Sequence, residues 1–353
     1  METIEKNNYE PPILFKQNAD YLLSLEKEFF NSLVLTKKSA NTIKNYRTDL
    51  NCFNQFLEKR QHLPCINNFG LQQVEEYAYF LEERYTSTNS RRRRVQTLRI
   101  FFDFLLSKTV VRENPVKKIS PCPKFLDVPR PASLEHIQTM FTYLKNESVV
   151  TTSASTVFPS LLACRNLVIV MLIYGQGLKV SELSQLQKRH LFLGKGPRVM
   201  INPPKRDPYT IPLQDVFVQV YNQYQKLFNR VLKEQKIVNP KSNANLNNNN
   251  IHNNFDSLLF NANHYRILAG GLSPRGLEII FEDLKKKLNI EITPKSLRQA
   301  CIFKWIAQKH PSTQIKEWLG VAPTYSLEPY LKLSSKNSYN YNDNFIYQLF
   351  LDH

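Results

Sequence analysis

The sequence has few of the residues that build disulfide frameworks or metal centres. Its five cysteines are odd in number, widely scattered and never in C-x-x-C spacing, which is typical of reduced cytosolic thiols. The seven histidines form no pair with ligand spacing, so we expect no metal site and no cofactor. No segment reaches about 18 apolar residues, the length of a membrane span. Residues 1–12 lack the apolar core of a signal peptide. We therefore expect a cytoplasmic protein without a membrane partner.

Acidic residues are also scarce. The 353 residues include 30 Asp and Glu against 47 Lys and Arg, a formal net charge of +17 at pH 7. An excess of this size favours a polyanionic partner, with nucleic acid ahead of an acidic membrane. A basic protein without such a partner is the alternative, because net charge also serves solubility. The hydrophobic fraction of 42% suffices for ordinary cores, and the length predicts about two domains.

The apolar spacing predicts a mainly α protein with a small β-hairpin or sheet in a second domain. Steps of three and four separate the apolar residues of one predicted helix, Ile43, Tyr46, Leu50, Phe53 and Leu57. Two strand-like segments, PRVMI and YTIPL, flank the turn NPPKRDP. Proline-rich and Asn-rich stretches mark linkers and insertions. We divide the chain into an irregular segment at 1–20, a helical domain at 21–113, a linker at 114–132, a second domain at 133–335 with a disordered insertion at 239–255, and a tail at 336–353.

Four consecutive arginines, Arg91 to Arg94, stand near the start of a predicted helix with Ser90 as its candidate N-cap. Cations at this end oppose the helix macrodipole. A compensating anion is therefore expected, and a phosphate backbone would serve. A solvated charge run is the alternative.

Four separated stretches occur in the order GLKVSELSQL, VMINPPKRDPYTIPL, TPKSLRQA and WLGVAPTYSLEPYLKL. Their order, spacing and predicted local structure resemble the tyrosine recombinase (phage integrase) family, in particular its bacterial Xer-type members. The resemblance covers roughly residues 22–335. It implies a helical DNA-binding domain followed by a mixed α/β catalytic domain. It also implies site-specific DNA strand exchange through a 3′-phosphotyrosyl intermediate, without metal or ATP.

The residue types in these stretches suit that chemistry. A phenol has a pKa of about 10, so it is a weak nucleophile at pH 7. Its attack on a phosphodiester adds charge to the phosphate oxygens, which guanidinium groups stabilise well. The departing 5′-oxygen needs a proton, which a positioned lysine or histidine supplies.

The nucleophile follows from the spacing of one motif. The family pattern Leu-Gly-His places the reacting tyrosine nine residues after the histidine. Here the triplet is Leu319-Gly320-Val321, and Tyr330 lies nine positions after Val321. The resemblance therefore assigns the nucleophile to Tyr330, and Tyr325 is interpreted as a packing or surface residue.

Three cationic residues follow from the same resemblance. Arg298 matches the second family arginine, and Lys295 stands where the family most often has histidine. Lys205 lies in the turn between the predicted strands, where the family keeps a lysine that acts as general acid. It is one residue off the usual register and is followed by Arg206, so the pair could equally be a plain basic hairpin tip.

Two positions depart from the family pattern. Lys179 replaces the first family arginine, which keeps the charge but loses the planar fork. Val321 replaces a histidine or tryptophan that would donate to the phosphate. Losing one such donor costs about 10²–10³ in rate. The alternatives are therefore an active recombinase and a catalytically weakened DNA-binding protein or partner subunit of an active paralogue. A type IB topoisomerase shares the chemistry but fits the N-terminal helices less well.

The resemblance implies that a tetramer, of one or two kinds of subunit, clamps two DNA duplexes. Such contacts are mostly sequence-independent and salt-sensitive. The side chains expected on DNA are Lys44, Arg47, Arg92, Arg93, Arg99, Lys117, Lys118 and Lys124. The apolar FIYQLFL in the tail resembles a segment that such recombinases donate to a neighbouring protomer, and folding back on its own domain is the alternative. Chromosome-dimer resolution and mobile-element integration both stay open.

Overall fold

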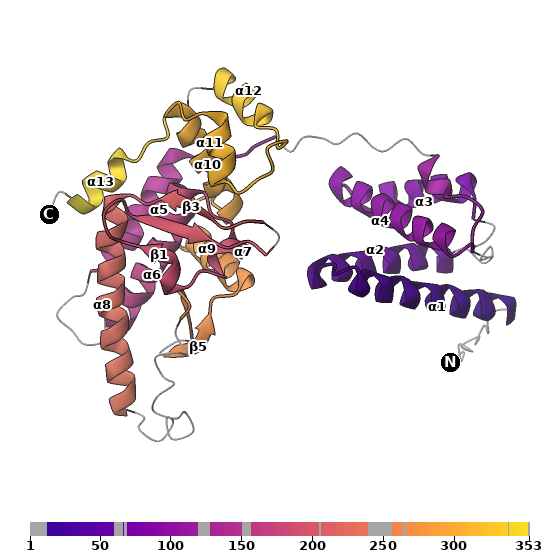
Figure 1. Cartoon of the computed structure of the whole chain (residues 1–353), viewed down its shortest axis with the longest axis horizontal. Coiled ribbons are helices and arrows are strands. Elements are labelled where there is room, and N and C mark those ends of the chain that lie inside the picture. Colours follow the sequence, from indigo (N-terminus) through magenta and orange to yellow (C-terminus); the bar gives the residue numbers. More distant parts are fainter. Residues whose placement is uncertain are drawn as a thin grey trace, which may run out of the picture. The chain divides into compact units, whose positions relative to one another are not determined.

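The computed structural model describes residues 13–59, 66, 69–118, 128–149, 157–204, 206–238, 256–263, 266–337 and 339–351. The chain divides into two compact units, residues 1–125 and 126–353 (Figure 1). The division falls inside the predicted linker at 114–132, whereas the predicted insertion at 239–255 lies outside the described residues. The mainly α fold class with small sheets is confirmed.

The described part of the first unit is built from helices around an aromatic core. Within the predicted stripe Leu50, Phe53 and Leu57 are buried, because the steps of three and four place them on one helix face. The unit contains α1 (Ile13–Leu35), α2 (Ala40–Lys59), α3 (Leu71–Arg84), α4 (Thr88–Ser107) and the short 3₁₀ helix η2 (Pro115–Lys117). Helix α1 begins inside the segment expected to be irregular. Prolines just before a helix are compatible with its start.

The N-cap of α4 is Ser87 and not Ser90, which corrects the sequence-based expectation. The Ser87 hydroxyl accepts a hydrogen bond from the Ser90 backbone N–H at 3.4 Å. The positive charge of the arginines that follow is partly neutralised by an acidic side chain of the same unit. Asp49 of α2 is 1% exposed and accepts hydrogen bonds from Arg93 at 2.8 Å and Thr97 at 2.9 Å. Its carboxylate also lies 3.9 Å from Arg94, so phosphate is not the only anion available to these cations.

The second unit is organised around α6 (Val157–Gln176), which packs against three helices. By length and composition α6 is apolar enough to cross a membrane, so the expectation that no segment reaches this length was wrong. Its apolar window is 78% buried within the fold, which is typical of the core helix of a soluble protein. The helices around it are α5 (Leu134–Glu147), α7 (Val180–Leu183), α8 (Asp215–Val238), α9 (Pro274–Leu288), α10 (Pro294–Ala307), α11 (Ser312–Trp318), α12 (Glu328–Lys336) and α13 (Asn344–Leu351).

The predicted hairpin is present in an antiparallel sheet of β1 (Leu191–Phe192), β2 (Arg198–Ile201) and β3 (Tyr209–Pro212). Ile201 pairs with Tyr209, so the tip of the hairpin, with Asn202 to Pro204 and Arg206 to Pro208 as its described residues, lies between them. A second described pair of strands is β4 (Phe260–Ala262) with β5 (Ile267–Gly271).

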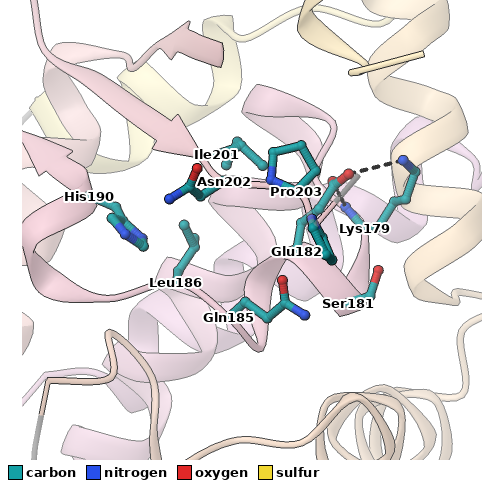
Figure 2. Close-up of a pocket in the computed structure, with 10 residues that line it drawn as sticks. Lys179, Ser181, Glu182, Gln185, Leu186, His190, Ile201, Asn202 and Pro203 are labelled. Carbon is teal, nitrogen blue, oxygen red and sulfur yellow. Dashed lines mark hydrogen bonds and ion pairs between the residues drawn. The ribbon is translucent and has the colours of Figure 1, made fainter. Parts of the chain in front are cut away.

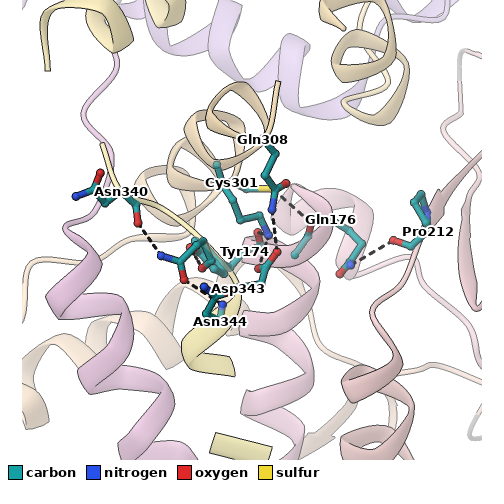
Figure 3. Close-up of polar contacts among 11 residues, drawn as sticks. Tyr174, Gln176, Pro212, Cys301, Gln308, Asn340, Asp343 and Asn344 are labelled. Carbon is teal, nitrogen blue, oxygen red and sulfur yellow. Dashed lines mark hydrogen bonds and ion pairs between the residues drawn. The ribbon is translucent and has the colours of Figure 1, made fainter. Parts of the chain in front are cut away.

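Polar contacts fasten the C-terminal segment to its own unit (Figure 3). Lys304 of α10 is 1% exposed and donates to Asp343 at 2.7 Å and to the Tyr174 carbonyl at 3.0 Å. The Tyr174 hydroxyl donates to the Asn342 carbonyl at 2.9 Å. Helix α13 then packs on α5 and α8, with Phe345 against Tyr174. Exchange of this tail between subunits stays a prediction.

Candidate active site

The turn after α11 is the point at which the site is assembled. The Val321 N–H donates to the Lys316 carbonyl at 3.1 Å, and the Gly320 N–H donates to the Glu317 carbonyl at 2.9 Å. This pattern ends the helix with a left-handed residue, and Gly320 has φ +57°. A Cβ at Gly320 would overlap the Tyr209 hydroxyl. Only glycine therefore lets the turn approach β3 so closely.

Two arginines from different elements bind consecutive carbonyls of this turn. Arg298 lies in the second turn of α10, whose first turn is capped by Thr293. It donates to the Leu319 carbonyl at 3.3 Å. Arg206, at the tip of the β2–β3 hairpin, donates to the Gly320 carbonyl. Residues far apart in the sequence are thus brought to one place by the turn.

Tyr330, the predicted nucleophile, lies in the first turn of α12 and is 8% exposed. Its ring centroid is 5.5 Å from that of Phe303 of α10. Burial and the nearby Tyr325 raise the pKa of Tyr330 to about 12, while hydrogen bonding from Gln299 and the charge of Arg298 lower it. Tyr330 therefore lies within the electrostatic reach of Arg298. Tyr325 is 40% exposed, in line with its interpretation as a surface residue.

Lys179 is tied to a neighbouring carboxylate. It precedes α7, and its Nζ lies 2.9 Å from Glu182 Oε1 while its backbone N–H donates to Glu182 Oε2 at 2.8 Å (Figure 2). The ammonium of Lys179 has three N–H donors, and one of them is used by Glu182. An arginine has five donors, so it would keep more of them for a phosphate after binding the same carboxylate. Glu182 therefore positions Lys179 and also neutralises part of its charge.

Tyr209 links this pair to the turn and was not singled out from the sequence. Burial and the Glu182 carboxylate raise the pKa of Tyr209, whereas Arg298 and Arg206 lower it. One hydroxyl is thus close to all three charged groups. Within the described residues it makes no hydrogen bond of good geometry. The available signal was its place as the first residue of a strand directly after a basic hairpin tip.

A pocket of about 240 Å³ lies beside the Lys179–Glu182 pair. Figure 2 shows Ser181 and Gln185 of the α7 segment on one side and Asn202 and Pro203 of the hairpin tip on the other. Polar groups of two elements therefore line a concave surface next to the site. Among the described residues, no group of three His, Cys, Asp or Glu side chains is placed to hold a metal ion.

Three further residues singled out from the sequence are Lys295, Lys205 and Val321. Lys295 is exposed in the first turn of α10, three residues before Arg298. Lys205 lies outside the described residues. Val321 is half-buried and packs against the core, so it offers the site no donor. The structure thus links Tyr330, Arg298 and Lys179 through one turn and one tyrosine, and leaves the roles of Lys295 and Lys205 as predictions.

Several of the basic residues predicted on DNA in the first unit have partners of their own. Arg47 lies over the Phe30 ring at 4.7 Å. Lys117 pairs with Asp103 at 2.6 Å, and Lys118 pairs with Glu113 at 2.5 Å. Their roles on DNA stay predictions. Of the other members of the set, Lys44 is exposed on α2 and Arg92 is half-buried on α4. Arg93 is bound to Asp49, and Arg99 donates to the Val116 carbonyl at 3.3 Å. Lys124 lies outside the described residues.

A buried phenol beside a guanidinium is an arrangement for nucleophilic attack on an anionic centre. A phenol is neutral at pH 7 even at its ordinary pKa of about 10, and burial raises the pKa of Tyr330 further, so attack requires loss of its proton. Arg298 favours the phenolate and retains further donors for an oxyanion. The site therefore suits transfer of a phosphoryl group to tyrosine.

Comparison with known proteins shows which families the chain resembles. Residues 27–109 match the phage integrase N-terminal SAM-like domain. The tyrosine recombinase XerC of Staphylococcus aureus (strain MRSA252) is 28% identical over 188 residues, which is 51% of this chain and 58% of that protein. The chain thus spans little more than half the length of that relative. XerC of Listeria monocytogenes serotype 4b (strain F2365) is 24% identical over 326 residues, 89% of this chain and 94% of the relative.

Solved structures show the same fold. The XerH recombinase bound to its palindromic difH substrate has a TM-score of 0.60 at 14% identity, covering 84% of this chain and 77% of that one. Lambda integrase residues 75–356 bound to DNA has a TM-score of 0.58 at 11% identity, covering 87% and 94%. With the matched N-terminal domain, the XerC relatives and this fold, the chain is similar to the tyrosine recombinase (phage integrase) family, in particular to its Xer members.

Proposed function

We propose that the protein is a site-specific tyrosine recombinase that cleaves and rejoins double-stranded DNA. The observation that carries the proposal is the placement of Tyr330. Its phenol is buried on α12 within reach of Arg298, and Arg298 binds the turn that precedes α12. One short segment therefore holds the nucleophile next to a cation that stabilises the reacting phosphate.

In the proposed reaction the Tyr330 hydroxyl gives up its proton to solvent water as its oxygen attacks the phosphorus of a phosphodiester. The new P–O bond forms as the bond to the 5′-oxygen breaks, which leaves a 3′-phosphotyrosyl link and a free 5′-hydroxyl. Lys205 is the proposed donor of the proton to the departing oxygen. Arg298, Lys295 and Lys179 stabilise the charge on the phosphate oxygens. A 5′-hydroxyl of the partner strand reverses the step, so no outside energy source is consumed.

A tetramer on two duplexes, of one kind of subunit or of two paralogues, is the proposed assembly, acting in the cytoplasm. Within it we propose that the tail at 336–353 passes to a neighbouring subunit. The cellular role is chromosome-dimer resolution or integration of a mobile element, which the same chemistry serves equally.

The experiment uses nicked suicide duplexes tiled from candidate sites of the source genome. A covalent protein–DNA band on a denaturing gel is expected with the wild type and is expected to be absent with Tyr330→Phe. Tyr325→Phe is the matched control, because this tyrosine lies five residues away but is exposed, and it should keep the band. A band that persists in Tyr330→Phe would refute the assignment.

A DNA-binding protein with weakened catalysis is the second candidate. It is favoured by Lys179, whose ammonium is already bound by Glu182, and by Val321, which donates nothing. On this alternative the wild type retards DNA on a native gel without a covalent band. Lys179→Arg combined with Val321→His should then restore the band, because both changes return hydrogen-bond donors to the site.

A further inference from the structure

Arg206 and Arg298 are both bound by the turn that follows α11. Their guanidinium groups donate to the carbonyls of Gly320 and Leu319, which are adjacent residues. Both charges also act on the Tyr209 hydroxyl. The hairpin tip is thus connected to the turn that leads to the nucleophile helix.

The Arg206 guanidinium keeps most of its hydrogen-bonding capacity. Arginine has five N–H donors, and among the residues that the structure describes only the Gly320 carbonyl accepts from it. It forms no ion pair with a described carboxylate, and its side chain is exposed. Lys179, by contrast, is bound by Glu182. Two neighbouring guanidiniums on neutral carbonyls repel each other until an anion lies between them.

We propose that Arg206 donates to the phosphate that Tyr330 attacks, as a second guanidinium beside Arg298, and supplies the donor that Val321 lacks. The ligand is a DNA phosphodiester, whose non-bridging oxygens match paired guanidinium forks. Arg206 reaches this place because its side chain is bound at Gly320, the residue directly before Val321. This inference rests on the proposed function and adds a residue to it.

The first measurement isolates phosphate binding from cleavage. In a Tyr330→Phe background, the affinity for the nicked duplex is measured by fluorescence anisotropy at several salt concentrations. Arg206→Ala should lower the slope of log K against log salt by about 0.9, the value for one phosphate contact. Arg198→Ala is the matched control, because Arg198 is exposed on the same hairpin and lies over the Phe192 ring, away from the tip. Equal slopes for the two variants would overturn the proposal.

The second measurement asks whether the contact is with the reacting phosphate. With tyrosine at 330, Arg206→Ala should slow cleavage of the native duplex by about 10²–10³-fold, and Arg198→Ala should not. On a duplex with a neutral methylphosphonate at the scissile position, the loss in Arg206→Ala should shrink, because less charge develops there. Val321→His should likewise reduce the loss, since it returns a donor.

These outcomes separate the inference from the proposed function. The same loss in Arg206→Ala on both duplexes would mean that Arg206 only holds the Gly320 turn, which overturns the inference but leaves recombination intact. Cleavage unchanged by Arg206→Ala would overturn it as well. If the wild type never forms a covalent band, the proposed function fails. A salt slope lowered by Arg206→Ala alone would then still support the phosphate contact.

Discussion

Three cations predicted on DNA in the first unit and two arginines of the candidate site in the second unit are held in different ways. In the first unit the basic residues predicted on DNA include Arg93, Lys117 and Lys118, each paired with an acidic side chain. In the second unit Arg298 and Arg206 are bound by backbone carbonyls. A carbonyl orients a guanidinium without cancelling its charge, whereas a carboxylate does both.

This difference indicates different tasks. A phosphate that binds these cations of the first unit must compete with the acidic side chains already paired with them. Each such contact therefore contributes little to the free energy of DNA binding. Exposed ion pairs are themselves worth only about 0–1 kcal/mol, so many weak and salt-sensitive contacts suit the holding of a duplex. The second unit keeps uncancelled charge at one point, which suits stabilisation of a transition state.

The largest expected effect concerns the buried acid of the first unit. Asp49→Ala should lower the free energy of unfolding of that unit by about 3–5 kcal/mol, because it leaves the buried Arg94 without its carboxylate. Urea unfolding followed by circular dichroism measures this. Glu113→Ala, which removes an exposed partner of Lys118, should cost less than about 1 kcal/mol. Similar costs for the two variants would contradict the distinction between buried and exposed pairs.

The next effect compares one arginine from each unit. Arg298→Ala should slow covalent-complex formation by about 10²–10³-fold, while Arg93→Ala should change it by less than about fivefold, the equivalent of an exposed ion pair. Single-turnover cleavage of the nicked duplex at saturating protein gives both rates. If Arg93→Ala slows cleavage as much as Arg298→Ala, the two kinds of cation do not have separate tasks.

Alkaline pH should weaken the second unit through Tyr330. Its pKa is raised from the ordinary value of about 10 to about 12 in the folded state, so the folded protein holds this proton more tightly. The contribution is fully present below pH 10 and is lost as pH rises towards 12. The loss is at most ~1.4 kcal/mol per pH unit for one group.

Tyr330→Phe should therefore make the free energy of unfolding less dependent on pH in that window. Unfolding with urea at several alkaline pH values measures this dependence. Tyr79→Phe, which changes a tyrosine of the first unit that is 68% exposed, should keep the wild-type dependence. Identical pH profiles for the wild type and Tyr330→Phe would show that burial of the phenol does not affect its ionisation.

The smallest expected effect comes from a substitution that frees a cation of the first unit from its acidic partner. Asp103→Asn removes the charge that pairs with Lys117, so DNA affinity should rise by about twofold to fivefold, the equivalent of an exposed ion pair. The salt slope should steepen slightly, because one more cation is available to phosphate. Fluorescence anisotropy with the same duplex reports both quantities. Unchanged affinity would mean that Lys117 does not contact DNA.

Much of the fold could be predicted because its signals are local. The apolar steps from Ile43 to Leu57 lie on α2, and the two strand-like segments pair as β2 and β3. The N-cap of α4 was misplaced because Ser87 and Ser90 are equally good cap residues. The structure uses Ser87, whose hydroxyl accepts from the N–H of Ser90.

The site could be predicted only in part, because some of its residues are defined by contacts between segments far apart in the sequence. Motif spacing singled out Tyr330, Arg298 and Lys179, whereas it did not single out Tyr209 or Gln299. Their importance depends on contacts with distant residues, such as Tyr209 with Gly320. For the same reason the arginine run was expected to need phosphate, although Asp49 from another helix lies against it.

The sequence by itself determined which groups are available: a net positive charge, a tyrosine nine residues after Val321, and valine where a donor would be expected. The tertiary structure alone decided which cations are cancelled and which remain available, as with Lys117 beside Asp103 and Arg206 beside the Gly320 carbonyl. The physical reason is that charge belongs to a side chain, whereas its neutralisation depends on distance. Distances between residues far apart in the chain exist only once the chain has folded.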